Sequence, residues 1–261
     1  MREVNNLPRP RRAVIIGGHS GLGFDIASML REEQYDILIA GRRRLVLDEA
    51  LQKLIRVGGA SENSILKVES CYLDIQDDDC IDACVDFYKR VFGDGLDVLV
   101  NCAGINKRAP ALEVKRPEIS EIIDTNAISA LILANKFFPF LCKGIRPQVI
   151  NMCSIFSSTT FQDRVSYSAS KAALLSITKT LALEFIKDGI QVNAVSPGPI
   201  MTELNKMFLE QPTKYQEFCS NMPYGKFGDE RSVSSLIRYV ASGENQFIVG
   251  SNFVVDGGWT I

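Results

Sequence analysis

The strongest constraint on the fold is a regular alternation of short apolar runs with longer stretches of helical period. The apolar runs are rich in valine, isoleucine and leucine, which is typical of strands buried on both faces of a parallel sheet. Right-handed crossovers between such strands place helices on both faces of the sheet. We therefore expect one α/β domain with a doubly wound parallel sheet of about seven strands, at residues 13–17, 36–40, 67–73, 96–101, 148–153, 190–195 and 252–255.

The stretches between these runs predict the helices and the limits of the domain. Helices are expected from about residue 22, over 43–57, after 77–79, over 118–138 and over 164–187. Residues 1–12 are interpreted as a basic, solvated tail, and residues 13–261 as the domain itself. A proline-containing, apolar segment at about 199–227 interrupts the alternation and is interpreted as a lid over a binding site.

Composition excludes several classes of protein. With 46% hydrophobic and 23% charged residues the chain is not disordered, and a net charge of −2 gives no case for nucleic acid binding. No apolar run spans a bilayer and no signal peptide is recognised, so we expect no membrane partner, a cytoplasmic location and reduced thiols at the seven cysteines. The only histidine, His19, lies in a glycine-rich turn, which leaves none for a catalytic triad or a zinc site elsewhere; no metal is expected.

A glycine-rich segment, Gly17-Gly18-His19-Ser20-Gly21-Leu22-Gly23, follows the first predicted strand. Glycines permit a tight turn, close approach of a ligand to the backbone, and packing of a helix against a strand. The unpaired N–H groups and the dipole at the start of the next helix favour a pyrophosphate. At the first strand–helix junction of an alternating chain, this segment predicts dinucleotide binding.

The end of the second strand bears on the choice between NAD and NADP. An acidic residue there would bind the ribose hydroxyls of NAD, but the position is Gly41. Arg42 follows and can pair with a 2′-phosphate, to which His19 and Ser20 can add donors. The alternative is that the run of three arginines merely opens a solvated helix. We expect NADP(H) to be favoured over NAD(H).

Four polar residues form the candidate catalytic group. Tyr167 and Lys171 are four residues apart and share a helix face, where an ammonium stabilises a phenolate. Tyr167 can then act as a general acid toward a ketone or a general base toward an alcohol. Ser154 follows the fifth strand, at the sheet edge where doubly wound folds bind ligands. Asn126 lies within a predicted helix, where an asparagine calls for a polar partner.

In order and spacing, these four residues and the glycine turn resemble the short-chain dehydrogenase/reductase family, particularly its 3-oxoacyl-carrier-protein reductases and gluconate 5-dehydrogenases. The resemblance covers residues 13–258 and implies a Rossmann-type fold. It implies that Ser154 polarises the substrate carbonyl and that Tyr167 exchanges the proton. Lys171 would assist Tyr167 and hold the nicotinamide ribose, and Asn126 would anchor a water that relays protons to Lys171.

The resemblance also implies cofactor contacts outside the glycine turn. Asp74 would line the adenine pocket or, alternatively, cap the next helix. Asn101 would brace the strand ends beside the cofactor. Further implied contacts are Ala103, Gly104, Tyr167, Lys171, Pro197, Gly198, Ile200 and Thr202. Two positions depart from the family pattern: Ile16 replaces a threonine and Cys102 replaces an asparagine, and each removes a hydrogen-bonding group.

The expected reaction is hydride transfer between NADP(H) and a small-molecule carbonyl compound or secondary alcohol. Apolar residues of the segment 199–227 favour a partly hydrophobic substrate such as a 3-oxoacyl group, whereas Lys107 or Arg108 could pair with a substrate carboxylate or phosphate. The alternatives are an NAD-dependent dehydrogenase of a polyol or sugar acid, and an NADP-binding redox sensor without turnover. The resemblance also implies a homo-oligomer, a dimer or tetramer, formed through the fourth and fifth helices.

Overall fold

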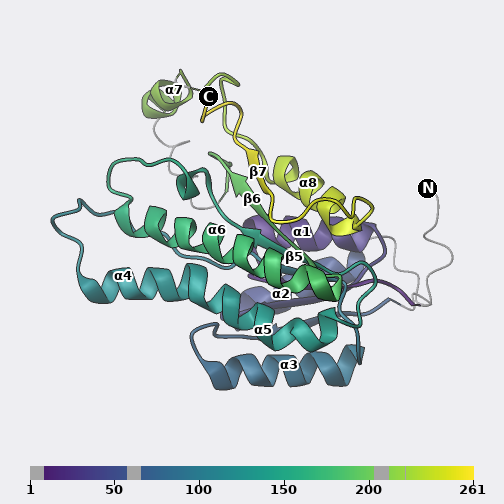
Figure 1. Ribbon diagram of the computed structural model, residues 1–261. Coiled ribbons are helices and arrows are strands. Elements are labelled where there is room, and N and C mark those ends of the chain that lie inside the picture. Colours follow the sequence, from purple (N-terminus) through teal and green to yellow (C-terminus); the bar gives the residue numbers. More distant parts are fainter. Residues whose placement is uncertain (1–8, 58–65, 203–211, 221) are drawn as a thin grey trace.

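The computed structural model describes residues 9–57, 66–202, 212–220 and 222–261 (Figure 1). Within them lies one parallel sheet of seven strands in the order β3-β2-β1-β4-β5-β6-β7, which confirms the predicted doubly wound fold. The strands are β1 (Arg12–Ile16), β2 (Asp36–Gly41), β3 (Val68–Tyr72), β4 (Val98–Asn101), β5 (Gln148–Met152), β6 (Gln191–Pro197) and β7 (Asn252–Val255).

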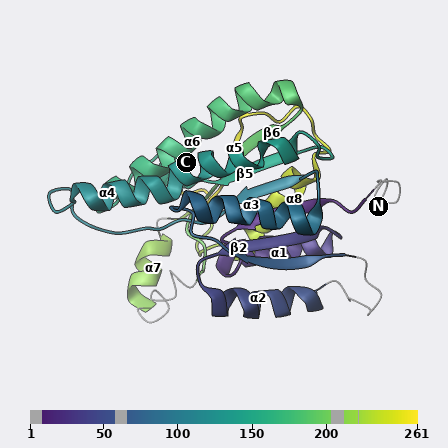
Figure 2. The same cartoon turned by 90° about the horizontal axis from the view of Figure 1, so that it is seen from below.

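Helices cover both faces of the sheet (Figures 1 and 2). Alternate residues of β1 show how the two layers are separated: Ala13 and Ile15 face the layer of α1, α2 and α8, whereas Val14 and Ile16 face that of α3, α5 and α6. The helices are α1 (Gly21–Glu32), α2 (Arg44–Arg56), α3 (Asp78–Phe92), α4 (Arg116–Ile123), α5 (Ser129–Leu141), α6 (Val165–Phe185), α7 (Pro212–Ser220) and α8 (Glu230–Ser242).

Helix α8 is absent from the sequence-based prediction. The side chain of Asp229 caps its first turn by accepting a hydrogen bond of 2.8 Å from the backbone N–H of Ser232. Its apolar residues Val233, Ile237, Val240 and Ala241 repeat at helical spacing and are buried against the sheet. The capping aspartate and the helical spacing of the apolar residues are both visible in the sequence, and together they indicate a helix between the segment 199–227 and the last strand.

The single helix predicted over 118–138 is wrong: α4 and α5 are separated by one wider π-helical turn, Asp124–Ile128. The Ser129 hydroxyl donates to the carbonyl oxygens of Asp124 and Thr125, at 2.6 and 2.8 Å, where it occupies acceptors of the regular helix ladder. Turns of this kind interrupt helices frequently at functional sites. The turn carries Asn126, which is 1% exposed.

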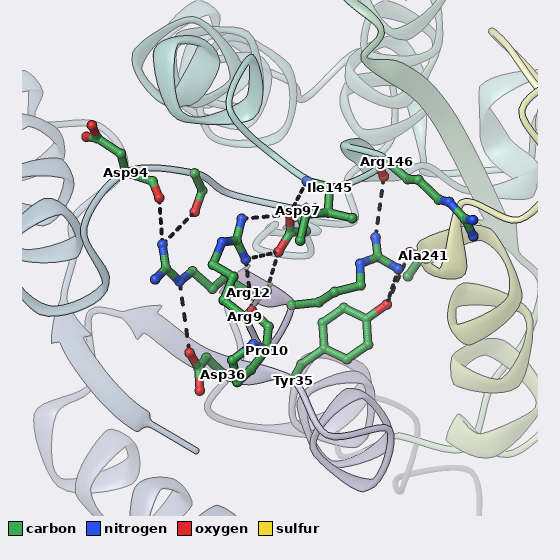
Figure 3. A network of polar contacts seen from close by, with 12 residues as sticks. Arg9, Pro10, Arg12, Tyr35, Asp36, Asp94, Asp97, Ile145, Arg146 and Ala241 are labelled. Carbon is green, nitrogen blue, oxygen red and sulfur yellow. Dashed lines mark hydrogen bonds and ion pairs between the residues drawn. The ribbon is translucent and has the colours of Figure 1, made fainter. Parts of the chain in front are cut away.

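Residues 9–12 do not form the solvated tail that the sequence predicts (Figure 3). Arg9 makes two hydrogen bonds, of 2.6 and 3.0 Å, to the carboxylate of Asp97, which is 0% exposed. The same carboxylate accepts hydrogen bonds from the backbone N–H groups of Arg12, which opens β1, and of Ile145. Asp97 thus fastens the start of β1 to the loop before β5, because one buried acid satisfies donors from both segments.

At the same end of the sheet, Arg11 contacts residues next to α1 and at the end of α8. Its guanidinium donates to the hydroxyl of Tyr35 at 2.6 Å and to the carbonyl oxygen of Ser242 at 2.8 Å. It lies 5.0 Å from the centre of the Tyr35 ring, over its face. The positive charges read as a tail are therefore part of the packing between β1, α1 and α8.

We predict that Asp97→Ala lowers the free energy of unfolding by about 3–5 kcal/mol, since it leaves the charge of Arg9 and two backbone N–H groups without their acceptor. Urea unfolding followed by circular dichroism measures this. Asp94→Ala is the matched control: it removes an ion pair with Lys143 in which both side chains are 59% exposed, and we expect a much smaller loss of stability because solvent screens the pair. Equal losses in the two variants would contradict the prediction.

Candidate active site

The glycine turn joins β1 to α1 at the carboxyl end of the sheet. A Cβ at Gly17 would lie 2.9 Å from the backbone nitrogen of Ala103, and Gly17 has a positive φ of 81°. A Cβ at Gly23 would lie 2.2 Å from the carbonyl oxygen of Gly17. Glycine is therefore required at both positions, and the turn packs directly against the residues after β4.

A cavity of about 550 Å³ lies in front of this turn. Its size and its backbone lining suit an extended small molecule. It is bounded on one side by Leu73, Ile75 and Gln76 after β3. The sequence-predicted residues that line it are Gly17, His19, Ser20, Gly21, Leu22, Gly23, Arg42, Ala103, Gly104 and Thr202.

Arg43, which the sequence analysis did not single out, has the closest contacts with the polar groups of the turn. Its Nε donates to Nε2 of His19 at 3.1 Å, and its Nη2 donates to the hydroxyl of Ser20 at 2.8 Å. Arg42 lines the same cavity, but the hydrogen bonds to His19 and Ser20 come from Arg43. The run of three arginines predicts a positive charge beside the turn, but the sequence does not show which arginine contacts it.

The imidazole of His19 occupies the space beside Gly41. A Cβ at Gly41 would lie 2.4 Å from Nδ1 of His19, so any side chain at the end of β2 must displace the ring. This Nδ1 is buried and has no hydrogen-bond partner among the described residues. Burial, and then the charge of Arg43, lower the pKa of His19 below its ordinary value. The neutral imidazole can then accept the hydrogen bond from Arg43.

A second cavity, of about 590 Å³, adjoins the first at the end of β4. The two share the lining residues Leu22, Cys102, Gly104, Ile105 and Thr202. An extended ligand can therefore pass from the glycine turn into the second cavity. The sequence-predicted residues around the second cavity are Leu22, Gly104, Ser154, Tyr167, Lys171, Pro197, Gly198, Ile200 and Thr202.

Lys171 is a buried charge in the wall of this cavity. Its side chain comes from α6, is 5% exposed, and donates to the carbonyl oxygen of Met152, the last residue of β5, at 2.7 Å. Its Nζ lies 5.8 Å from the centre of the Tyr167 ring, one turn earlier in the helix. The predicted pairing of Tyr167 and Lys171 on one helix face is thus present, with the ammonium fixed between helix and sheet.

Ser154 lies between β5 and α6, where it caps a short 3₁₀ turn, Ile155–Ser157. Its Oγ accepts a hydrogen bond of 3.2 Å from the backbone N–H of Phe156, which in turn packs edge-to-face on Tyr167 with 6.2 Å between ring centres. This acceptor role leaves the hydroxyl proton of Ser154 available to an oxygen in the cavity.

Asn126 links two segments that surround the second cavity, the loop after β4 and helix α6. Its side chain donates to the carbonyl oxygen of Ile105 at 2.9 Å and accepts from the N–H of the same residue at 2.8 Å. It also donates to the hydroxyl of Ser170 at 2.9 Å. A Cβ at Gly104 would lie 3.0 Å from Oδ1 of Asn126 and 3.6 Å from Nζ of Lys171. The π-helical turn thus fastens the loop after β4 to α6.

Asn101 and Asp74 lie behind the cavity walls. Asn101 is buried and donates to Oδ1 of Asn151 at 2.8 Å, and Asn151 donates to Thr178 of α6 at 2.9 Å, so the strand ends are braced as the sequence suggested.

The carboxylate of Asp74 accepts from the N–H of Gln76 at 3.1 Å, whereas Asp77 caps α3. The role of Asp74 beside an adenine ring stays a prediction.

The segment expected to form a lid is described in part, because residues 203–211 and 221 lie outside the described ranges. Ile200 forms a bridge with Gly228, and Phe218 of α7 stacks on Trp259 with ring centres 4.7 Å apart. Both aromatic residues line the second cavity together with Phe156 and Phe161. The aromatic wall combines residues distant in the sequence, so periodicity does not reveal it.

Arg164 is a further residue of the second cavity that sequence reasoning missed. It directly precedes α6, is 8% exposed, and donates to Oδ1 of Asn106 at 2.6 Å. Burial, and then the charge of Arg108, lower the pKa of Arg164 from its ordinary value. Arg108, which was a candidate for pairing with a substrate anion, lines the same cavity; Lys107 instead pairs with Glu121.

Two further findings concern the remaining expectations. All seven cysteines fall within the described ranges and are free thiols. No described helix is both long and apolar enough to cross a membrane.

A family model and several known proteins are similar to this chain over most of its length. Residues 16–260 match a family model described as enoyl-(acyl carrier protein) reductase, a branch of the short-chain dehydrogenases. The chain belongs to the short-chain dehydrogenase/reductase family. Among curated members of this family, the chain is 26% identical to gluconate 5-dehydrogenase of Gluconobacter oxydans strain 621H, over 96% of this chain and 94% of that protein.

Two further relatives show how widely the family resemblance extends. The chain is 28% identical to 3-oxoacyl-(acyl-carrier-protein) reductase of Staphylococcus aureus strain Mu50, over 95% of this chain and 97% of that protein. It is also similar to the structure of L-sorbose reductase from Gluconobacter frateurii complexed with NADPH and L-sorbose, with a TM-score of 0.87, 28% identity, and coverage of 96% and 97% of the two chains. The expected membership and fold are therefore confirmed, and the protein is an oxidoreductase of this family.

The surroundings of His19 give a prediction that needs no ligand. Because the chain has one histidine, its imidazole proton resonances can be followed by NMR without assignment ambiguity. We expect a titration midpoint below 6.5 in the ligand-free protein, since burial and the charge of Arg43 both disfavour the imidazolium. Arg43→Gln should move the midpoint upward, and Arg42→Gln serves as the control. A midpoint at or above 6.5 in the unsubstituted protein would contradict this account.

Proposed function

We propose that the protein transfers a hydride between NADP(H) and a small-molecule carbonyl compound or secondary alcohol, with Tyr167 as the general acid or base. The observation that supports this most directly is the convergence of Ser154, Tyr167 and Lys171 on one cavity that adjoins the glycine turn. Hydride transfer to a carbonyl carbon needs one proton at the oxygen, and this cavity holds both a proton donor and a charge that stabilises its conjugate base.

The residues fit a nicotinamide dinucleotide. Glycines at positions 17 and 23 add no side chain to the first cavity, and the buried Nδ1 of His19 has no hydrogen-bond partner in the described parts of the chain. The start of α1 at Gly21 presents its unpaired N–H groups to a pyrophosphate. Pro197, Gly198, Ile200 and Thr202 would border the nicotinamide end. When bound, the cofactor supplies or accepts the hydride.

In the direction of carbonyl reduction, each residue acts on the carbonyl oxygen or on its neighbour. The hydroxyl of Ser154 donates a hydrogen bond to that oxygen and polarises the carbonyl group. Tyr167 gives its phenolic proton to the same oxygen as the hydride reaches the carbon, so one hydride and one proton convert the ketone to the alcohol. The ammonium of Lys171, held by the Met152 carbonyl, stabilises the phenolate that remains. Alcohol oxidation reverses these steps.

Asn126 serves as a positioning residue in this proposal. Its amide ties the loop at Ile105 to Ser170, and so keeps the cavity wall opposite Lys171 in place. The water relay that the family resemblance implies for Asn126 is retained as part of the proposal. It would return the proton lost by Tyr167 from solvent through Lys171.

The preference for NADP(H) over NAD(H) rests on the end of β2. An acidic side chain at Gly41, which NAD requires there, would collide with His19. Arg43 holds both His19 and Ser20 at the rim of the first cavity, and its planar guanidinium is suited to a 2′-phosphate dianion. Arg42, the residue first expected to fill this role, adds a second positive charge to the same cavity.

A cytoplasmic homo-oligomer, dimer or tetramer, completes the proposal. Four apolar residues of the π-helical turn and of the α6 region are exposed, with Leu183 at 79% and Val165 at 48%, as are Ile128 and Ile186. Exposed apolar residues on these elements are suited to pairing with a second copy of the chain. Light scattering on the purified full chain measures the assembly.

Tyr167→Phe tests catalysis itself. We expect it to lower kcat for NADPH-dependent reduction of ketones at least about 1000-fold, since it removes the proton donor and leaves the cavity unchanged in shape. The control variant Tyr224→Phe changes an exposed tyrosine on the surface and should retain activity. NADPH binding measured by fluorescence should be nearly equal in all three proteins. Turnover that survives in Tyr167→Phe would contradict the role of Tyr167, and binding without any turnover would favour the redox-sensor alternative.

Arg43→Gln tests the cofactor preference. We expect the Kd of NADPH to rise about 10- to 100-fold, since one charged contact with the 2′-phosphate is lost, while the Kd of NADH changes less than about threefold. Arg42→Gln, from the neighbouring exposed position, should have a smaller effect. An unsubstituted protein that binds NADH as tightly as NADPH would instead favour the alternative of an NAD-dependent polyol or sugar-acid dehydrogenase.

A further inference from the structure

Arg164 is a buried cation whose position the proposed chemistry does not explain. Arg164 is 8% exposed, and its guanidinium lies 6.0 Å from the centre of the Phe156 ring. It donates one hydrogen bond, from Nη1 to Oδ1 of Asn106 at 2.6 Å. Buried arginines are ordinarily paired with a carboxylate, because removing the charge from water is unfavourable without a counterion.

No carboxylate in the described parts of the chain forms an ion pair with Arg164. Besides burial, the like charge of Arg108 lowers the pKa of Arg164, whereas Tyr167 and the carboxylate of Asp163 raise it by smaller amounts. Glu217 borders the same cavity from α7, but it forms no ion pair with Arg164 and has other interactions. Arg164 and Arg108 therefore give this part of the cavity an excess of positive charge that the described residues leave unpaired.

Part of the Arg164 guanidinium has no hydrogen-bond partner among the described residues. Arg164 precedes Tyr167 by three residues, one helical turn, so the two side chains reach the same cavity from neighbouring positions. Asn106 holds Nη1, whereas Nε and Nη2 have no hydrogen bond to a described residue, and Arg164 lines the second cavity. A guanidinium edge of this kind binds a planar oxyanion through two parallel hydrogen bonds.

We propose that Arg164 binds an anionic group of the substrate, in the first place a carboxylate, so that the preferred substrates are oxo acids and hydroxy acids. The inference rests on the proposed oxidoreductase function and narrows its substrate class. Asn106 is the positioning residue, since it fixes one nitrogen of the guanidinium. The carboxylate lies toward Asn106, and the reacting carbon lies between Ser154 and Tyr167.

The walls of the cavity are consistent with a small, elongated acid. Phe161 packs between Phe156 and Trp259, with ring centres 6.5 Å from each, and these rings cover the carbon chain or the sugar face of a substrate. A phosphate shares the charge and the hydrogen-bonding pattern of a carboxylate, and is distinguished from it by experiment. A neutral ketone would leave the charge of Arg164 without a counterion in the closed site.

The test compares matched pairs of substrates with NADPH as cofactor. The pairs are 5-oxo-D-gluconate with L-sorbose, which differ only by a carboxylate in place of a hydroxymethyl group, 4-oxopentanoate with its methyl ester, and fructose 6-phosphate with fructose. We expect kcat/KM of the unsubstituted enzyme to be at least about tenfold higher for the carboxylate member of at least one pair. Arg164→Gln should lower kcat/KM for the acid at least about 30-fold, mainly through KM, and change the neutral partner less than about threefold. A preference limited to fructose 6-phosphate would assign the site to phosphate and overturn the carboxylate assignment.

Two further variants separate charge recognition from folding. Arg164→Lys keeps the charge but loses the planar fork, and we expect it to recover part of the selectivity for the acid. Arg108→Gln removes the exposed arginine of the same cavity and should have a smaller effect. Equal loss for acid and neutral substrates in Arg164→Gln would overturn the proposal, because Arg164 would then only support the helix that carries Tyr167.

A binding measurement keeps this test independent of turnover. With the enzyme–NADP⁺ complex of the full chain, 10 mM 5-oxogluconate or 4-oxopentanoate should raise Tm of the unsubstituted protein and not of Arg164→Gln. Absence of a shift in both proteins with both acids overturns the anion site, whether or not ketones are reduced. Loss of turnover on neutral ketones, with the acid-dependent shift intact, would instead count against the proposed reduction alone.

Discussion

The arrangement of the site depends on one constraint, which is that every strand of a parallel sheet brings its carboxyl end to the same edge. Gly17 follows β1, Gly104 follows β4 and Ser154 follows β5, and the register of these neighbouring strands places the three segments side by side. The glycines then decide how close the segments come. Because a Cβ at Gly17 would meet the backbone of Ala103, a larger residue there would separate the glycine turn from the loop that covers Lys171.

Three buried charges illustrate how the same fold treats ions differently. Asp97 has a bidentate arginine and two backbone donors, and it fastens the end of the sheet far from the cavities. Lys171 has one protein acceptor, the carbonyl oxygen of Met152, and stands beside Tyr167. Arg164 has one neutral partner and no described carboxylate. Of these three residues, Asp97 is satisfied within the protein and supports the architecture, whereas Lys171 and Arg164 border the site, where a ligand can complete their interactions.

The sequence predicts those features that depend on spacing within one segment. Tyr167 and Lys171 share a helix face because of their four-residue spacing, and the glycine turn follows from its place after the first strand. Features that depend on contacts between segments escape it. The choice of Arg43 over Arg42 as the partner of His19 depends on how the chain enters α2. Arg9 was misread for the same reason, since its partner Asp97 lies 88 residues away. The π-helical turn at Asn126 is local, but it escapes prediction because apolar periodicity does not show where the Ser129 hydroxyl bonds.

In the proposed reaction, a hydride and the proton of Tyr167 meet on one carbonyl group in the second cavity. The most direct measurement uses NADPH deuterated at the transferring position of nicotinamide C4, with mass spectrometry of the alcohol formed. The account predicts one deuterium on the carbinol carbon of the product, formed by the unsubstituted enzyme and not by Tyr167→Phe. Product without the label, or labelled product formed equally well by Tyr167→Phe, would contradict it.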